Sequence, residues 1–159
     1  MRRFVKRSAL AVTAAVTVLV MTAAPSIAAT SYWYGQQNTS SPTLYQTNLL
    51  YHTTDFAYPP STPAAATITT VEYSWRMMFG VPSNTTLNVY LCWGSTDNYC
   101  ALLSAGTASS GSGGTPAFAG LSARTNFHYT LALTASKTYV LPPPYYPSSF
   151  YWMQVDYTY

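Results

Sequence analysis

Hydrophobic and polar residues alternate with a period of two along four segments of the chain. In residues 71–79 the apolar side chains occupy the odd positions, while Glu, Ser and Arg occupy even positions. A similar alternation recurs in residues 87–91, 127–133 and 150–159. Because successive side chains of a β-strand point to opposite faces, each segment is predicted to be a strand with one face toward a core.

Segments rich in Gly, Ser and Pro separate these strands. Residues 106–116 (GTASSGSGGTP) are predicted to form a flexible loop, and residues 141–149 (LPPPYYPSS) an extended proline-rich connection. Residues 30–51 are expected to supply one or two more strands, and no segment beyond residue 28 keeps a 3.6-residue period. The pattern predicts an all-β fold, an antiparallel two-sheet β-sandwich of about seven strands.

The first 28 residues have the parts of a secretory signal peptide. Four basic residues precede an uncharged run over residues 9–24, and the small residues Ser26 and Ala28 favour cleavage after Ala28 or Ala29. A spanning helix needs about 20 strongly apolar residues, whereas this run is shorter and rich in Ala and Thr, so no stable membrane insertion is expected. We predict a signal peptide over residues 1–28 and a single exported domain over residues 29–159.

Removal of that leader reverses the sign of the net charge. Four of the 7 Lys and Arg residues lie in the leader, which leaves three basic residues against 4 acidic ones and a net charge of −1. Such a surface offers no positive field for phosphates, so nucleic acid is not an expected partner.

Aromatic residues are abundant in a chain that has few charges. The sequence has 15 Tyr and 4 Trp, and such side chains bury a large ring while keeping a polar atom available. Trp33, Trp93 and Trp152 lie near strand ends, on a turn, or at nominally polar positions. They are candidate partner-binding residues, with the alternative that they fill a sheet face or cover a loop.

The 2 cysteines, Cys92 and Cys100, flank a short polar run between two predicted strands. Neither the paired spacing of a structural zinc site nor a Cys-x-x-Cys redox motif is present. An even pair of cysteines in an exported chain instead predicts a disulfide that closes a hairpin.

The remaining polar residues form no recognisable catalytic motif. His52 lies beside a loop and His128 at a polar position of its strand, where each is expected to be exposed. There is no G-x-S-x-G nucleophile motif, and the spacing of the carboxylates indicates no glycosidase pair. We therefore expect a protein that is not an enzyme and that has no catalytic residues, no metal site and no cofactor; a secreted hydrolase is the weakest alternative.

The order of these features resembles the FlhE family of periplasmic flagellar proteins. A strand ending in Trp-Arg is followed by the pattern Pro-(x)4-Leu-x-Val-x-Leu-Cys, a second Cys, a Gly- and Ser-rich segment leading to Phe, and a final Val-x-Tyr. The resemblance covers roughly residues 67–159. The matching residues are Trp75, Arg76, Pro82, Leu87, Val89, Leu91, Cys92, Cys100, Phe118, Val155 and Tyr157.

The resemblance implies a periplasmic protein with a non-enzymatic role in flagellar assembly. Members of that family are thought to act near the export apparatus and rod as chaperone-like or sealing factors, so flagellar rod or export-apparatus proteins are the expected partners. The alternative is an exported carbohydrate- or cell-surface-binding module that uses exposed aromatic residues.

The predicted disulfide has a measurable effect on stability. Closing a nine-residue loop removes chain entropy worth roughly 2.5 kcal/mol from the unfolded state, a substantial share of a domain's net stability of about 5–15 kcal/mol. Substitution of Cys92→Ser, or strong reductant, is expected to lower the thermal unfolding midpoint by several degrees. An unchanged midpoint in calorimetry would contradict a stabilising disulfide.

Overall fold

The computed structural model describes residues 28–39, 42–78, 80–145 and 149–159, so the predicted signal peptide lies outside the described residues except for Ala28. No helix long and apolar enough to cross a bilayer occurs in these ranges. Ten strands are formed by the described residues: β1 Thr30–Thr39, β2 Leu44–Gln46, β3 Leu50–His52, β4 Thr67–Arg76, β5 Thr86–Trp93, β6 Cys100–Gly106, β7 Ser110–Thr115, β8 Phe127–Thr134, β9 Val140–Tyr145 and β10 Ser149–Thr158.

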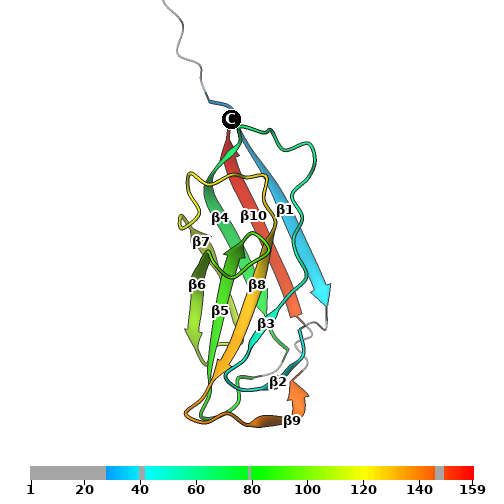
Figure 1. The fold of residues 1–159 in the computed structure, drawn as a ribbon, viewed down its shortest axis with the longest axis vertical. Coiled ribbons are helices and arrows are strands. Elements are labelled where there is room, and N and C mark those ends of the chain that lie inside the picture. Colours follow the sequence, from blue (N-terminus) through cyan, green and yellow to red (C-terminus); the bar gives the residue numbers. More distant parts are fainter. Residues whose placement is uncertain (1–27, 40–41, 79, 146–148) are drawn as a thin grey trace, which may run out of the picture.

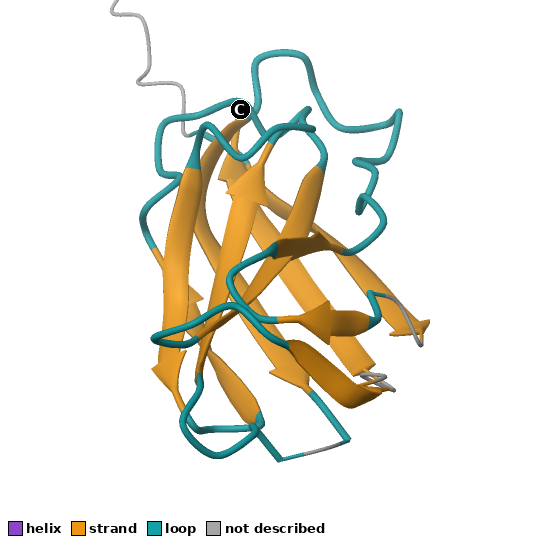
Figure 2. Cartoon of the chain, turned by 60° about the horizontal axis from the view of Figure 1, so that its bottom comes forward, coloured by secondary structure: helices purple, strands orange, loops and turns teal. Residues whose placement is uncertain are grey.

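Two four-stranded antiparallel sheets make up most of the molecule (Figure 1). The first sheet has the order β1-β10-β4-β7, and the second has the order β3-β8-β5-β6. Strands β2 and β9 form a small separate ribbon at one end of the sandwich, which Figure 2 shows from below. The predicted all-β antiparallel sandwich is confirmed, with extra strands supplied by the N-terminal, Gly-rich and Pro-rich segments.

The alternating pattern of the sequence places one face of each central strand in the core. In β5, Leu87, Val89 and Leu91 are at most 1% exposed. In β10, Tyr151, Met153, Val155 and Tyr157 are likewise buried. Burying one such side chain contributes about 1.5–3 kcal/mol relative to leaving it exposed. Apolar residues from both sheets meet in a single core cluster.

Tyr129 of β8 connects the two sheets through the core. Its ring packs against Tyr151 of β10 with ring centroids 5.0 Å apart, and its hydroxyl donates to the Trp152 carbonyl oxygen at 2.7 Å. Burial raises the pKa of the Tyr129 hydroxyl well above its ordinary value, so this group stays a neutral donor. A buried hydroxyl without a partner would be costly, so this hydrogen bond fixes how β8 lies over β10.

The Gly-rich segment is not the flexible loop that its composition predicts. Residues 110–115 form β7, an edge strand that pairs with β4, with Gly111 opposite Trp75 and Gly113 opposite Tyr73. A Cβ atom at Gly111 would lie 2.8 Å from Trp75 Nε1. Glycine occurs here because the aromatic side chains of β4 occupy the space that a side chain of β7 would need.

The proline-rich segment also contains a strand. Residues 140–145 form β9, which pairs with β2 at Leu44 opposite Tyr145 and at Gln46 opposite Val140. Residues 146–148 of the predicted connection lie outside the described residues. Proline lacks the N–H that a ladder needs, which explains why this pairing is short and irregular and stands outside the two main sheets.

The close packing of β7 on Trp75 gives a testable prediction. Substitution of Gly111→Ala is expected to destabilise the fold by about 1–3 kcal/mol, because the added methyl group overpacks a well-filled position. The matched control is Gly114→Ala in the same strand, where the new Cβ atom has 3.8 Å to its nearest neighbour. Urea unfolding of both variants measures the difference, and equal stabilities would contradict the steric explanation.

Candidate functional site

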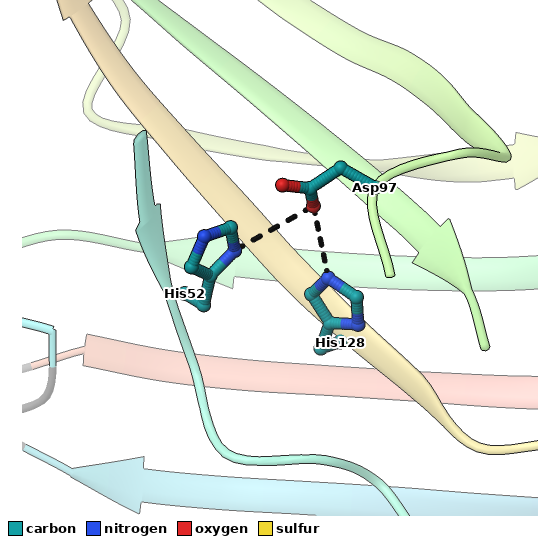
Figure 3. A group of neighbouring side chains, drawn as sticks. All are labelled: His52, Asp97 and His128. Atoms are coloured by element: carbon teal, nitrogen blue, oxygen red, sulfur yellow. Dashed lines mark hydrogen bonds and ion pairs between the residues drawn. The ribbon is translucent and has the colours of Figure 1, made fainter. Parts of the chain in front are cut away.

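Two histidines meet on the outer face of the second sheet because of strand register. β3 pairs with β8 so that His52 lies opposite Thr130. Since His128 and Thr130 are two residues apart on β8, their side chains point to the same face, away from the core that Tyr129 enters. The rings of His52 and His128 meet edge to face with their centroids 5.6 Å apart (Figure 3).

The turn between β5 and β6 brings Asp97 to the same place. The predicted disulfide is present, and the Cys92–Cys100 bond joins two residues that lie opposite each other in the β5–β6 pairing. A hydrogen bond from the Trp93 amide to the Tyr99 carbonyl, 2.9 Å long, closes the hairpin next to it. The turn then folds over β8 and directs Asp97 at the two imidazoles (Figure 3).

A single carboxylate oxygen, Asp97 Oδ1, receives most of the polar contacts. It accepts a hydrogen bond from Thr130 Oγ1 at 2.9 Å, and it lies 3.1 Å from His128 Nε2 and 3.5 Å from His52 Nδ1. The other ring nitrogen of His128, Nδ1, lies 3.0 Å from the carbonyl oxygen of Gly94. We call His52, Asp97 and His128 the His–Asp cluster.

The surroundings of Asp97 favour its ionised form. Burial raises the pKa of this carboxyl, but the hydrogen bonds of His128 and Thr130, together with the positive charge of the two histidines, lower it by more. The net effect is a pKa below the ordinary value of 3.8. Asp97 is therefore a carboxylate at neutral pH.

The predicted exposure of His128 is wrong, whereas His52 is exposed as expected. The side chain of His128 is only 5% exposed and that of His52 is 47% exposed. The strand pattern correctly places His128 on the face away from the core, but the turn carrying Asp97 covers this face. The contact between Asp97 and His128 joins residues 31 positions apart. The alternation of polar and apolar residues within one strand cannot predict such a contact.

The cluster does not have the arrangement of a hydrolase triad. The hydroxyl of Thr130 is buried and donates to Asp97, while the hydroxyl of Ser95 donates to Asp55 at 3.3 Å. Neither hydroxyl is both accessible and activated by an imidazole, which a nucleophile requires.

The same three side chains could instead hold a metal ion. One nitrogen each from His52 and His128 and one oxygen from Asp97 all lie within 4.8 Å of one another. They border a surface pocket of about 290 Å³ that is lined by polar side chains: His52, Thr53, Asp55, Ser95, Thr96, Asp97 and His128. The sequence alone does not predict this set, because Asp97 belongs to no motif and 76 positions separate His52 from His128.

The three candidate tryptophans occupy different environments. Trp33 is 4% exposed and its Nε1 donates to the Ala123 carbonyl at 3.0 Å, so Trp33 belongs to the core and is not a surface binding residue. Trp93 is half-buried and donates to the Ser122 carbonyl at 3.1 Å. Trp152 is also half-buried, and it alone of the three lies on the outer face of the first sheet.

That outer face carries aromatic and acidic side chains together. The exposed Tyr32 and Tyr34 of β1 lie opposite Asp156 and Gln154 of β10, and Gln154 in turn lies opposite Glu72 of β4. We call the set of side chains on this surface the aromatic face, and its members are Tyr32, Tyr34, Glu72, Trp152, Gln154 and Asp156.

The comparisons with known proteins identify the fold. No protein-family model matches the chain, and no curated protein matches it either. Among solved structures, one described as the crystal structure of FlhE is similar, with a TM-score of 0.61 and 20% sequence identity. The match covers 82% of this chain and 98% of that one, so the two share a fold over nearly the whole of the solved protein.

The low pKa of Asp97 predicts a dependence of stability on pH. The folded-state pKa lies below the unfolded one, so the carboxylate stabilises the fold fully above about pH 4 and progressively less as pH falls through the folded pKa. The unmodified protein should therefore have a higher free energy of unfolding than the Asp97→Asn variant, and this difference should be larger near pH 6 than near pH 2.5. Urea unfolding of the disulfide-bonded protein in metal-free buffer measures this difference.

The control for this experiment is Glu72→Gln, which removes an exposed carboxylate from the opposite sheet. This variant shows how much of any pH dependence comes from the loss of a carboxylate in general, because Glu72 lies on β4, in the sheet opposite the histidines. A constant difference for Asp97→Asn across the same pH range would show that the carboxylate gains nothing from the histidines.

Proposed function

We propose that this protein acts in the periplasm as a non-enzymatic factor of bacterial flagellar assembly. The observation that carries the proposal is the match to the FlhE crystal structure over 98% of that chain. The sequence resemblance in the strand that contains Cys92 supports it independently. A disulfide also suits the oxidising compartment to which a secretory signal peptide would deliver the chain.

The aromatic face is the surface best suited to hold a protein partner. Tyr32 and Tyr34 are 58% and 65% exposed, and such rings supply large contact areas with little loss of side-chain freedom on binding. Tyrosine and tryptophan are enriched among the residues that dominate interface energies. The half-buried Trp152 of β10 lies opposite Gln36, which is the next residue on the same face of β1 after Tyr34.

The charges on this face define the kind of partner it fits. Glu72 is exposed and Asp156 is half-buried, and both carboxylates lie among the aromatic rings. Arginine stacks on aromatic rings and pairs with carboxylates. The partner segment should therefore combine arginine or lysine with apolar side chains, and a rod or export-apparatus subunit would present it.

Binding of this kind needs no chemical step. A chaperone-like or sealing factor acts by covering a partner surface until assembly is due, and the area and complementarity of the contact determine how strongly it does so. Both four-stranded sheets present an outer face. Among the described residues, it is the outer face of the first sheet that combines exposed tyrosines with carboxylates in adjacent strands.

Site-specific photo-crosslinking in living cells tests the proposal. A photoreactive amino acid at Tyr34 on the aromatic face is expected to crosslink to a flagellar rod or export-apparatus protein in the periplasm. The matched control places the same group at Leu102, which is 55% exposed on β6 of the opposite sheet. The control position should give no such product.

Deletion of the gene provides the second measurement. We expect altered motility or altered timing of rod and filament growth, restored by the unmodified protein but not by Tyr34→Ser combined with Trp152→Ala. Normal flagella in the deletion strain, together with no flagellar crosslink at Tyr34, would refute the proposal. Retention of the protein on cell-wall polysaccharide, lost in the same double variant, would instead support the carbohydrate-binding alternative.

A further inference from the structure

We propose that the His–Asp cluster is a binding site for one divalent transition-metal ion, of which zinc is the best-suited candidate. Its ligands would be His52 Nδ1, Asp97 Oδ1 and His128 Nε2. Imidazole nitrogen and carboxylate oxygen are ligands that zinc takes in proteins, and three protein ligands with a fourth open position form one of its ordinary arrangements.

The ligand atoms lie close enough together that small side-chain movements would give the spacing around a tetrahedral ion. Zinc lies about 2.0–2.2 Å from nitrogen and oxygen ligands, which places neighbouring ligand atoms roughly 3.3–3.6 Å apart. Asp97 Oδ1 lies 3.5 Å from His52 Nδ1 and 3.1 Å from His128 Nε2, and the two nitrogens lie within 4.8 Å of each other. The side chain of His52 is 47% exposed, so a small rotation can bring its nitrogen to the ion.

Gly94 gives His128 the hydrogen-bond acceptor that the second nitrogen of a metal-binding histidine needs. Its Nδ1 faces the Gly94 carbonyl and its Nε2 faces Asp97 Oδ1, so both nitrogens face oxygen acceptors. A neutral imidazole carries one N–H and can satisfy only one of them. With an N–H toward Gly94, the lone pair of Nε2 points at the cluster, which is the arrangement of histidine ligands whose second nitrogen donates to a carbonyl.

Groups around the cluster hold the ligands in place. Thr130 donates a hydrogen bond to Asp97 Oδ1 at 2.9 Å, which orients the carboxylate. Asp55 Oδ1 lies 3.9 Å from His128 Nδ1 and adds negative charge next to the site. The Asp55 carboxylate is itself fixed by Asn126 Nδ2, which donates to its Oδ2 at 3.2 Å.

The composition of the chain makes the site unusually easy to test. The whole sequence contains 2 histidines, and both belong to the cluster. None of the described cysteines is free, because Cys92 and Cys100 form the disulfide. The grouping of those two cysteines with Asp97 therefore offers no thiolate, and zinc binding through histidine can occur only at this site.

The experiment is a calorimetric titration of zinc chloride into disulfide-bonded, tag-free mature protein that has been stripped of metal. We expect one zinc ion per chain. The variants His52→Ala and Asp97→Asn should each bind zinc at least about tenfold more weakly. Ser112→Ala, which removes an exposed polar side chain from β7 of the opposite sheet, should bind like the unmodified protein.

A second readout distinguishes a built site from loose surface binding. Cobalt(II) in place of zinc should give the visible absorption of a tetrahedral complex in the unmodified protein and not in His52→Ala. Because His52 is largely exposed, this variant is expected to fold normally, which circular dichroism checks. Absence of zinc binding, or equal affinity in His52→Ala, would overturn the proposal and leave the cluster as a set of polar contacts between Asp97 and the two histidines.

Discussion

The two sheets are held in one relative position by a hydrogen bond inside the core. Tyr129 of β8 reaches across the sandwich and donates to a backbone carbonyl of β10. Apolar packing alone is non-directional, so it would allow the sheets to slide or rotate by small amounts. A buried hydroxyl can be satisfied in few positions, and this one fixes β8 over β10.

Local patterns in the sequence predicted the parts of the fold that are governed by burial on one side of a strand. The parity of β5 and of β10 correctly identified which residues face the core. The sequence-based prediction was wrong for segments whose residue choice is explained by contacts with another strand. The glycines of β7 look like a linker until Trp75 is placed opposite Gly111, because the missing side chain is matched to a ring that is far away in the sequence.

The candidate site could be predicted from the sequence only in part. The disulfide follows from two cysteines in an exported chain, but its role in carrying Asp97 to His128 does not. That contact depends on the direction in which a turn folds, and on the pairing of β3 with β8, which brings His52 to a strand 78 residues away. The difference between Trp33 and Trp152 is likewise set by strand position, since the former faces the core and the latter faces out.

The aromatic face and the His–Asp cluster lie on opposite outer surfaces of the sandwich, with the core between them. Facing sheets in such folds are about 10 Å apart, and substitutions at that separation without shared partners usually have independent effects. A ligand at one surface can therefore be accommodated without rearranging the other. The arrangement permits a partner protein and an ion to be bound at the same time.

The Cys92–Cys100 disulfide makes the pairing of β5 with β6 independent of the turn that connects these two strands. The disulfide and the hydrogen bond from Trp93 to Tyr99 end the β5–β6 pairing at a fixed point. Changes of sequence or length in residues 94–98 are thus prevented from shifting the register of β5 against β8. Such a turn can acquire or lose polar side chains during evolution at little cost to folding, so related sandwiches can carry different chemistry above the same strand.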